Sequence, residues 1–387
     1  MLAKLGHSNG TSLPSNGSDL SGDETLRLRH GFTARIISEV GSAMDDGQKV
    51  PELHDGMGCF MAPEGGYILV RNHEIREIDQ SVDPEMAYDP RCRGGTTTVH
   101  LDQDLNVDYQ YLSLTGTLRN CSGGVMPWGS WLSCEEQFLT LGEYRHGYVF
   151  EVNHRHANTE PEPLVDLGRF EHEACIWEPI YGHVYMTEDK GDGNLYRFIP
   201  NRAQDLSAGG VLQALGLNGK ANPTQMQCLW ITISDPDPSV DTLRFEAQSK
   251  GAARFVRPEG LWIDQGGIYF STTAGGKHGA GEIYRYIVTG RDKGLLERIH
   301  ESDGSSIVQP DALTRAPNGD LLICTDSAES TQSIVGMRPN GSTYVFAEGK
   351  YCGWAGITCS PDQKVLFVNQ QYLGRTLAIT GDWSQLS

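Results

Sequence analysis

The sequence predicts an all-β protein, and a β-propeller of six blades fits it best. Helical patterns of apolar residues are scarce along the 387 residues. Short apolar runs that open on Gly, Asn or Asp recur six times, and further strand-like runs lie between them. Radial repetition suits such a chain, because blades of four strands leave few exposed strand edges.

Each recurring run begins with turn residues, continues with β-branched, aromatic or aliphatic residues, and ends in polar residues. In chain order the runs are EGGYILVRNHE (64–74), WGSWLSCEE (128–136), YGHVYMTEDK (181–190), QGGIYFSTT (265–273), NGDLLICTDS (318–327) and DQKVLFVNQQ (362–371). Between them lie GTTTVHL, GYVFEVN, NLYRFIP, EIYRYIV and STYVFAE, which we interpret as further strands. The spacing is looser than in a WD40 array and no WD signature recurs, so a pair of β-sandwiches or a parallel β-helix stays open as an alternative.

The domain organisation expected from the sequence is a short arm followed by one domain. Residues 1–25 are rich in Ser, Gly and Asn and poor in large apolar residues, which predicts a disordered N-terminal arm. No linker divides residues 26–387, which are expected to form a single propeller. The arm has neither an apolar signal core nor a twin arginine, so no export signal is expected in this chain and the compartment stays open.

Charge and cysteine content exclude several classes of function. The formal net charge of −19 repels phosphate backbones, so no nucleic-acid partner is expected, and no apolar run is long enough to span a membrane. The excess of carboxylates suits hard cations such as calcium. The nine cysteines form no CxxC pair, which argues against a zinc knuckle and against a full disulfide framework.

The run MPWGSWLSCEE (126–136) raises the question of why two adjacent glutamates end an aromatic strand. If the recurring strands are the innermost strands of a propeller, their ends bring several acids to one axis. These acids are Glu74, Glu136, Glu188, Asp189 and Asp326. Clustered carboxylates raise one another's pKa, so such a cluster predicts bound metal, whereas solvated loop acids are the alternative for each residue taken alone.

Four segments combine acids with unusual neighbours: LRNCSGGVMPWGSWLSCEE (118–136), GRFEHEAC (168–175), RPEGLWID (257–264) and QPDALTRAPNGD (309–320). A thiolate such as Cys121 favours iron or zinc, while carboxylates suit calcium, magnesium or manganese. Arg257 and Glu259 share one face of a strand, where the glutamate can hold a cation and the guanidinium can fork onto a phosphate. The chain has no G-x-S-x-G elbow, no H-E-x-x-H motif and no P-loop.

The run NCSGGVMPWGSWLSCEE (120–136) resembles the signature of the PhoX family of alkaline phosphatases. RNHE, GRFEHEA, VYMTEDKGDGNLYRFIP, RPEG, QPDALTRAPNGDLLICTD and SPDQKVLFVN continue the resemblance in the family's order, over about residues 30 to 370. The resemblance implies a six-bladed propeller with a mixed iron and calcium centre in its channel. It also implies hydrolysis of small phosphate monoesters without a serine nucleophile.

The resemblance also implies roles for single residues. The implied metal ligands are Cys121, Glu136, Glu173, Glu259 and Asp311, with Cys121 as the thiolate ligand of iron and Asp311 as a calcium ligand. Arg257 is the implied phosphate-contacting arginine, and Asn72 is a second implied contact to the phosphate. Glu135 is excluded, because it points away from Glu136 in an extended segment.

Two departures from the family pattern concern the end of the chain. Members commonly carry a glutamate before the final SPD segment, but YCGWAGITCSPD has Gly353 or a neighbour at that position. One metal ligand is then absent, unless Glu348 or Cys352 substitutes for it. Ala312 stands where shorter relatives often carry asparagine. Family members are usually periplasmic or extracellular, and the exported ones carry a twin-arginine signal that this sequence does not contain.

Two other functions stay open beside the phosphatase. One is a calcium-dependent lactonase, which EGLWID and PDALTRAPNGDLLICTD also suggest, although a site that uses calcium alone needs no thiolate. The other is a propeller without catalytic activity that uses calcium for stability, as the missing glutamate near Gly353 suggests.

Overall fold

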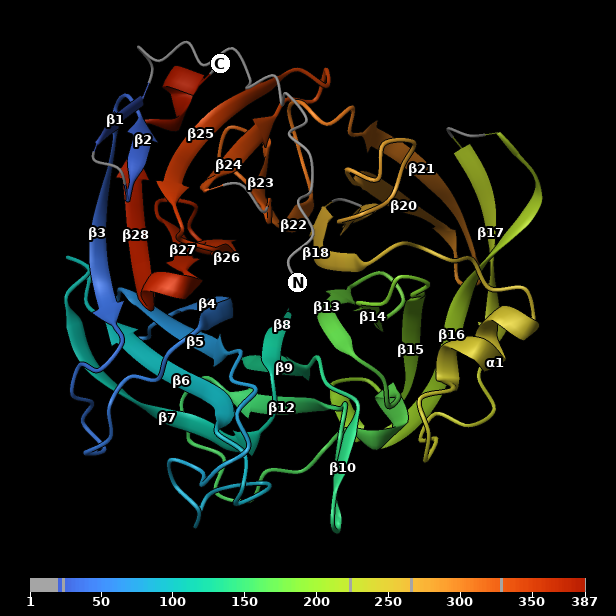
Figure 1. Ribbon diagram of the computed structural model, residues 1–387, viewed down its shortest axis with the longest axis horizontal. Helices are drawn as coiled ribbons and strands as arrows, with labels where there is room; N and C mark the ends of the chain where they lie inside the picture. The colour runs from blue at the N-terminus through green and yellow to red at the C-terminus, as the bar shows by residue number, and fades with distance from the viewer. Residues whose placement is uncertain (1–19, 23–24, 223–224, 265–266, 328–329, 387) are drawn as a thin grey trace, which may run out of the picture.

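The computed structural model describes residues 20–22, 25–222, 225–264, 267–327 and 330–386. Apart from the helix α1 (Leu243–Ser249) and three short 3-10 turns, the regular structure within these residues is β-strand. The 3-10 turns are η1 (Val165–Leu167), η2 (Gln371–Leu373) and η3 (Trp383–Leu386). The strands are arranged in sectors around a central axis (Figure 1), which confirms the all-β class and a propeller-like arrangement. Among the described residues there is no helix with the length and apolar character needed to cross a membrane.

Six strands form a closed ring around the axis, in which each strand contacts the next and the last contacts the first. These inner strands are β4 (His54–Met61), β8 (Asn120–Met126), β13 (His172–Glu178), β18 (Pro258–Asp264), β22 (Pro310–Arg315) and β26 (Trp354–Cys359). Further strands pair with them antiparallel, outward from the axis. The ring therefore brings segments from six distant parts of the chain to one place.

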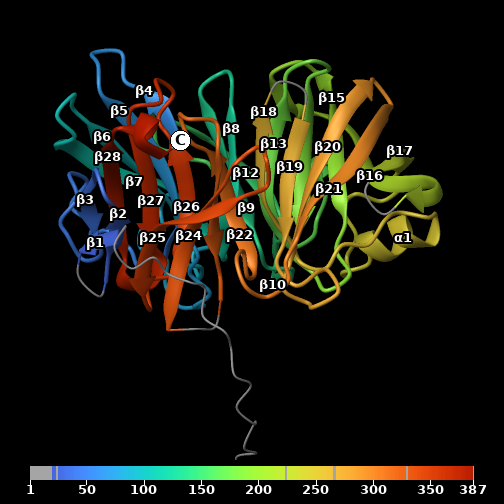
Figure 2. The ribbon, with the colours of Figure 1, turned by 90° about the horizontal axis from the view of Figure 1, so that it is seen from above.

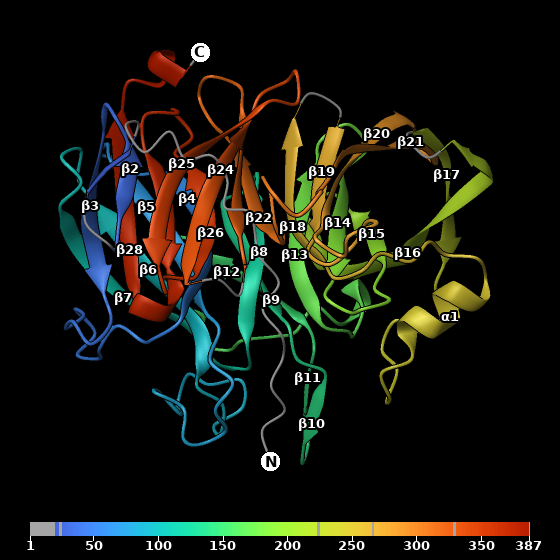
Figure 3. The same cartoon turned by 45° about the horizontal axis from the view of Figure 1, so that its top comes forward.

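Two regular four-stranded sheets and one shorter sheet make up the N-terminal half of the ring and its closure. One comprises β4, β5 (Tyr67–His73), β6 (Gly94–Leu101) and β7 (Val107–Thr117). The other comprises β26, β27 (Leu366–Gln370), β28 (Arg375–Gly381) and β3 (Phe32–Glu39). The shorter sheet comprises β8, β9 (Ser130–Glu135) and β12 (Val149–Asn153). Between β9 and β12, the hairpin of β10 (Leu139–Leu141) and β11 (Tyr144–His146) projects from the body of the molecule (Figure 3).

The expectation of six separate four-stranded blades is corrected by the pairing of β17 (Gln225–Thr232). This strand joins two sectors, because it pairs with β16 on one side and β21 on the other. The resulting nine-stranded sheet holds β13, β14 (His183–Glu188), β15 (Leu195–Arg202), β16 (Asp205–Asn222), β17, β21 (Lys293–Glu301), β20 (Glu282–Gly290), β19 (Gly267–Thr272) and β18. The physical reason is the length of β16. Its residues 205–214 pair with β15, and its residues 213–222 pair with β17 (Figure 2). Counted over the described residues, four sheets have four or more strands.

A six-stranded sheet contains the described part of the N-terminal segment. It holds β22, β23 (Leu321–Thr325), β24 (Thr331–Met337), β25 (Thr343–Lys350), β2 (Arg27–Arg29) and β1 (Leu20–Gly22). Residues 20–22, which the sequence assigns to the arm, therefore form a paired strand at the edge of this sheet. Residues 1–19 of the expected arm lie outside the described residues.

The recurring runs identified in the sequence form the second strand of each sector and not the innermost one. They correspond to β5, β9, β14, β19, β23 and β27, each paired with an inner strand. These second strands are buried on both faces, as β5 illustrates, and this makes them continuous apolar runs. The inner strands begin with polar and small residues, so their apolar pattern is weaker.

Small residues allow the inner strands to approach one another closely. The third residue of each inner strand is Gly56, Ser122, Ala174, Gly260, Ala312 or Gly356. A Cβ atom on Gly56 would lie 2.5 Å from the Cα atom of Ser122 in the next inner strand. A Cβ atom on Gly356 would lie 2.2 Å from the backbone oxygen of Asp55, and Gly356 has a φ of +58°. A larger residue at these positions would push neighbouring inner strands apart.

We expect Gly356→Ala to destabilise the fold by about 2 kcal/mol more than Gly47→Ala, because overpacking adds a cost of this order. Both glycines have positive φ, so both substitutions carry backbone strain. Only Gly356 also meets neighbouring backbone, since nothing lies within 4 Å of a Cβ on Gly47. Urea unfolding of the two variants measures the difference, and equal losses would contradict close packing of the inner strands.

Candidate metal centre

The second residue of each inner strand lines one small cavity at the axis. These axial residues are Asp55, Cys121, Glu173, Glu259, Asp311 and Ala355. The cavity has a volume of about 100 Å³. Five of the six axial residues carry a metal-ligating side chain, and the sixth, Ala355, carries only a methyl group.

A second set of residues surrounds the axial residues. These flanking residues directly follow the second strands, and they are Glu74, Glu136, Asp189, Thr273, Asp326 and Gln371. The same backbone hydrogen bond positions all six. The N–H of each flanking residue donates to the carbonyl of the residue that precedes the inner strand, over 2.8 to 3.2 Å.

The turn into each inner strand depends on backbone conformation. In five of the six sectors the residue that precedes the inner strand is left-handed, with φ between +51° and +58°. These residues are Leu53, Arg119, Arg257, Gln309 and Gly353. For the four that are not glycine this conformation costs on the order of 1 kcal/mol or more. The left-handed conformation occurs where the chain turns toward the axis, so these strained residues lie next to the cavity.

The donor atoms fall into three overlapping groups, each with its atoms within 4.8 Å of one another. The groups are Asp55, Glu74 and Cys121, then Cys121, Glu136 and Glu173, and finally Glu173, Glu259 and Asp311. Neighbouring groups share one residue, because Cys121 belongs to the first two and Glu173 to the last two. The three groups therefore form one continuous row of candidate metal positions across the cavity.

The buried carboxyl groups of the cavity raise one another's pKa, and bound cations would relieve their repulsion. Burial raises the pKa of Glu173 well above its usual range, and the Glu259 and Asp311 carboxylates raise it further. Burial and the Asp326 carboxylate likewise raise the pKa of Asp311 to about 8. In addition, Oε2 of Glu173 is buried and has no hydrogen-bond partner among the described residues. An unpartnered buried carboxylate oxygen among like charges fits a metal ligand.

Two arginines neutralise part of this charge. Arg119 contacts Glu74 at 2.9 Å and Glu136 at 3.0 Å. Arg257 forks onto Asp189 with Nε at 2.9 Å and Nη2 at 2.8 Å, and Nη2 also lies 2.8 Å from Glu259. The Arg257 side chain remains 38% exposed while it lines the cavity, so its guanidinium lies at the cavity mouth.

Six of the seven residues that the sequence proposes for the site line this one cavity. They are Cys121, Glu136, Glu173, Arg257, Glu259 and Asp311. The seventh, Asn72, does not line the cavity. It is fully buried, its Nδ2 donates to the carbonyls of Cys121 and Ser122, and its Oδ1 accepts from Trp131 and Ser133. Asn72 therefore holds the start of β8 in position and does not face the cavity.

Glu135 and Glu188 also lie away from the cavity. Glu135 faces the opposite side of β9 from Glu136, where it accepts hydrogen bonds from His146 and from backbone N–H groups. Glu188 is buried beside Tyr196, whose hydroxyl donates to it at 2.8 Å. The other expected acids, Glu74, Asp189 and Asp326, do line the cavity.

The position without a ligand is Ala355, two residues after Gly353. Neither proposed substitute lies in the cavity: Glu348 pairs with Arg27 at 2.9 Å, and the Cys352 thiol faces the Gln332 amide. The side chain of Gln371, from the same sector, also lines the cavity. Its Nε2 donates to Asp55 and to Glu74, so it supplies hydrogen-bond donors where a sixth carboxylate would add charge.

Sequence reasoning missed Asp55, Arg76, Gln371 and Tyr372 among the cavity residues. Asp55 had a signal that could have found it. Each inner strand begins with a triplet whose last residue is small: HDG (54–56), NCS (120–122), HEA (172–174), PEG (258–260), PDA (310–312) and WAG (354–356). The middle residue of the triplet is the axial residue. Recognition of this repeat would have added Asp55 and identified Ala355.

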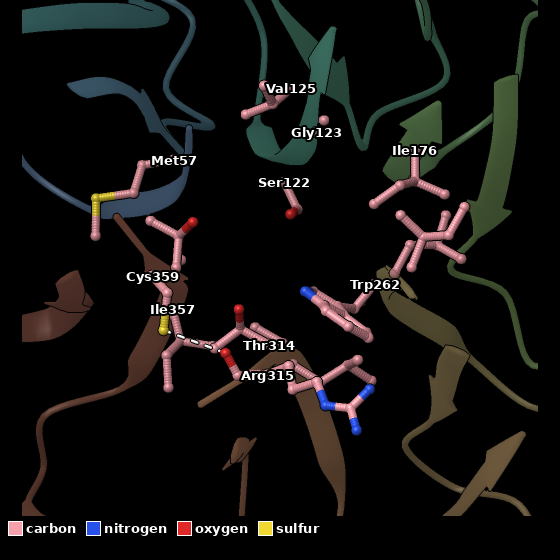
Figure 4. Close-up of a pocket in the computed structure, with 18 of the residues that line it drawn as sticks. Met57, Ser122, Gly123, Val125, Ile176, Trp262, Thr314, Arg315, Ile357 and Cys359 are labelled. Carbon is pink, nitrogen blue, oxygen red and sulfur yellow. Dashed lines mark hydrogen bonds between the residues drawn. The ribbon is translucent and has the colours of Figure 1, made fainter. Parts of the chain in front are cut away.

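A second cavity lies further along the same six strands, beyond the small residues (Figure 4). It has a volume of about 760 Å³ and is lined largely by apolar and aromatic side chains, including Met57, Ile176 and Trp262. Arg315 also lines it and pairs with Asp264 at 2.6 Å. None of the three donor groups lines this cavity, so the acidic and apolar parts of the channel are chemically distinct.

The sequence matches the family model described as alkaline phosphatase PhoX over residues 15–110 and 103–374. The chain belongs to the PhoX family. PhoX proteins are metalloenzymes, and the three donor groups supply candidate ligands here. A search of curated proteins finds no match for the chain.

Solved structures similar to this PhoX chain agree with its fold. One is Pseudomonas fluorescens PhoX in complex with vanadate, a transition state analogue, which is 18% identical with a TM-score of 0.72, covering 94% of this chain and 97% of that one. Another is an auxiliary nutrient binding protein from Bacteroides thetaiotaomicron, which is 10% identical with a TM-score of 0.53, covering 91% and 78%. At these identities the likeness supports the propeller-like fold and nothing finer.

Proposed function

We propose that this protein is a metal-dependent phosphatase that hydrolyses phosphate monoesters of small molecules in the cavity at the axis. One observation supports the proposal in addition to the family membership. A row of donor groups that includes the Cys121 sulfur lies beside a half-buried arginine whose plane is fixed by Asp189 and Glu259. Cations to bind a phosphate and an arginine to orient it are two of the parts that phosphoryl transfer uses.

The donor sets suggest which metals bind. The group of Cys121, Glu136 and Glu173 contains the thiolate, which suits iron, and the group of Glu173, Glu259 and Asp311 contains only carboxylates, which suits calcium. When bound, such cations would neutralise charge on the phosphate and polarise the oxygens in contact with them. In this assignment Glu136, Glu173 and Glu259 are ligands and not general bases.

The remaining groups would orient the phosphate. Arg257 would fork onto its oxygens, since its Nη2 lies at the cavity mouth and is held by two carboxylates. Arg119 would hold Glu74 and Glu136 in place, because it bridges them. The close-packed small residues would close the far end of the cavity, so that the phosphate enters from the mouth and the alcohol stays outside. This arrangement fits monoesters of varied alcohols.

Elemental analysis combined with two activity assays tests the proposal. The protein is purified without chelators or a metal column, and it is assayed with p-nitrophenyl phosphate and with a lactone. Iron and calcium together with phosphate release would support the phosphatase. Calcium alone with lactone hydrolysis would favour the lactonase. The presence of Cys121 in two donor groups argues against a site for calcium alone, because calcium prefers oxygen ligands. No metal in folded protein would leave a non-catalytic propeller.

We expect the metal-free protein to lose stability as the pH rises. Burial, followed by the Asp326 carboxylate, raises the pKa of Asp311 from 3.8 to about 8 in the folded state. The folded protein keeps this proton between those two pH values while the unfolded chain releases it, so the stability present below pH 3.8 is lost as the pH rises toward 8. Thermal unfolding after chelator treatment should show a melting temperature that falls over this range. Restored iron and calcium should abolish the fall, and a flat profile without metal would contradict the expectation.

A further inference from the structure

A second cluster of ligating side chains lies on the side of β9 opposite the cavity. It consists of Asp89, Cys92 and His146, which are all buried and whose donor atoms lie within 4.8 Å of one another. Asp89 and Cys92 belong to the connection between β5 and β6, and His146 ends β11. The backbone N–H of Cys92 donates to the carbonyl of Asp89 at 3.0 Å, and this turn holds the two residues close together.

Two distances within the cluster are close to those of a tetrahedral metal site. Nε2 of His146 lies 3.7 Å from Sγ of Cys92 and 3.4 Å from Oδ2 of Asp89. A zinc ion at about 2.3 Å from sulfur and about 2.0 Å from nitrogen and oxygen would separate the ligand atoms by about 3.5 Å and about 3.3 Å. A proton on Nε2 would make only weak hydrogen bonds to Cys92 and Asp89. The distance of 3.4 Å to Asp89 is long for a hydrogen bond, and one proton cannot point at both atoms.

The surroundings of the cluster orient its ligands as in known zinc sites. Oε1 of Glu135 accepts a hydrogen bond from Nδ1 of His146 at 2.7 Å, which directs Nε2 at the cluster, where a bound metal would replace the Nε2 proton. Arg91 donates to Asp89 from its backbone N–H, its Nε and its Nη2. A carboxylate oxygen has two lone pairs, so Oδ2 can accept from Arg91 and still bind a metal.

We propose that Asp89, Cys92 and His146 bind a zinc ion, with a water molecule as the fourth ligand. Thiolate, imidazole and carboxylate in a tetrahedral arrangement favour zinc over calcium or magnesium. Through Asp89, Cys92 and His146, the zinc ion would cross-link the connection between β5 and β6 to the hairpin of β10 and β11. It also fixes Glu135, the neighbour of Glu136 on β9. The proposal does not depend on the proposed phosphatase function.

Metal content of matched variants tests the proposal. The full chain and its variants Cys92→Ser, His146→Asn, Cys121→Ser and Cys228→Ser are loaded with zinc chloride, dialysed against a weak chelator and analysed for zinc. We expect the parent and Cys228→Ser to keep one zinc ion per chain more than Cys92→Ser and His146→Asn, whatever zinc the axial cavity holds, and Cys121→Ser to keep this additional ion. Cys228 is a buried cysteine outside both metal clusters, so it controls for the substitution itself.

Cobalt substitution of the parent keeps the test decisive where a variant fails to fold. Cobalt bound by Cys92 should give a thiolate charge-transfer absorption that remains in Cys121→Ser. Zinc held equally by the parent and by Cys92→Ser would overturn the proposal, as would loss of zinc and of the cobalt absorption in Cys121→Ser alone. Absence of phosphatase activity, by contrast, would count against the proposed function and leave the zinc result unaffected.

Discussion

Replacing Glu173 with glutamine is expected to abolish phosphatase activity and to empty two of the three donor groups. Glu173 is the residue that these two groups share, and its Oε2 has no hydrogen-bond partner among the described residues. A neutral amide offers a weaker ligand oxygen and adds N–H donors that a cation repels. Loss of several kcal/mol of charge stabilisation corresponds to a fall in kcat of about a thousandfold or more. Elemental analysis and the p-nitrophenyl phosphate assay measure both effects.

Glu171→Gln is the matched control for this variant. Glu171 precedes β13 and pairs with Lys190 at 2.6 Å, outside the cavity, so its replacement should leave metal content and activity close to the parent's. After chelator treatment, Glu173→Gln should unfold at the same or a higher temperature than the parent, because it removes a buried carboxyl group that is costly to ionise beside Glu259 and Asp311. Full metal content in Glu173→Gln would show that Glu173 is no ligand.

Replacing Arg257 with alanine is expected to lower kcat by about a hundredfold to a thousandfold, the usual effect of removing one positioned donor. Metal should remain bound, because the donor groups contain no atom of Arg257. Arg257→Lys should recover only part of the loss, since an ammonium keeps the charge but cannot fork onto a phosphate. Steady-state kinetics with p-nitrophenyl phosphate give kcat and KM for each variant.

Arg315→Ala separates the two parts of the channel. Arg315 lines the larger apolar cavity, where it pairs with Asp264. If catalysis takes place in the acidic cavity, this variant keeps the parent's kcat. A loss in Arg315→Ala equal to that in Arg257→Ala would move the reaction to the apolar cavity and contradict our assignment.

Most residues of the candidate metal site could be proposed from the sequence, because the candidate ligands stand in short segments of unusual composition. Cys121, Glu173 and Glu259 each lie between a polar or proline residue and a small one. That spacing follows from the packing of the inner strands, where only small residues fit after the axial position. Asp55 belongs to the same pattern, but HDG carries a single acid and is recognised only when the six triplets are compared.

The parts that could not be predicted depend on contacts between distant segments. In the sequence, Asn72 is a polar residue near a strand end. Only the position of β8 shows that its amide already donates hydrogen bonds to the backbone of Cys121 and Ser122. The joining of two sectors depends on β17, whose partner β21 lies more than sixty residues away in the chain. The cluster of Asp89, Cys92 and His146 likewise assembles from two segments that share no motif.

The closure of the ring has a consequence for the order in which the protein becomes functional. β3 pairs with β28, so Ile36 lies opposite Leu377, and the ring is complete only when a late strand reaches an early one. Contacts between residues so far apart form slowly, because a long loop must first be closed. During synthesis every candidate metal ligand leaves the ribosome before β28 does, yet the ligands are gathered at one point only by a closed ring. A metal that needs ligands from several sectors would therefore be bound only after the last strand has joined the ring.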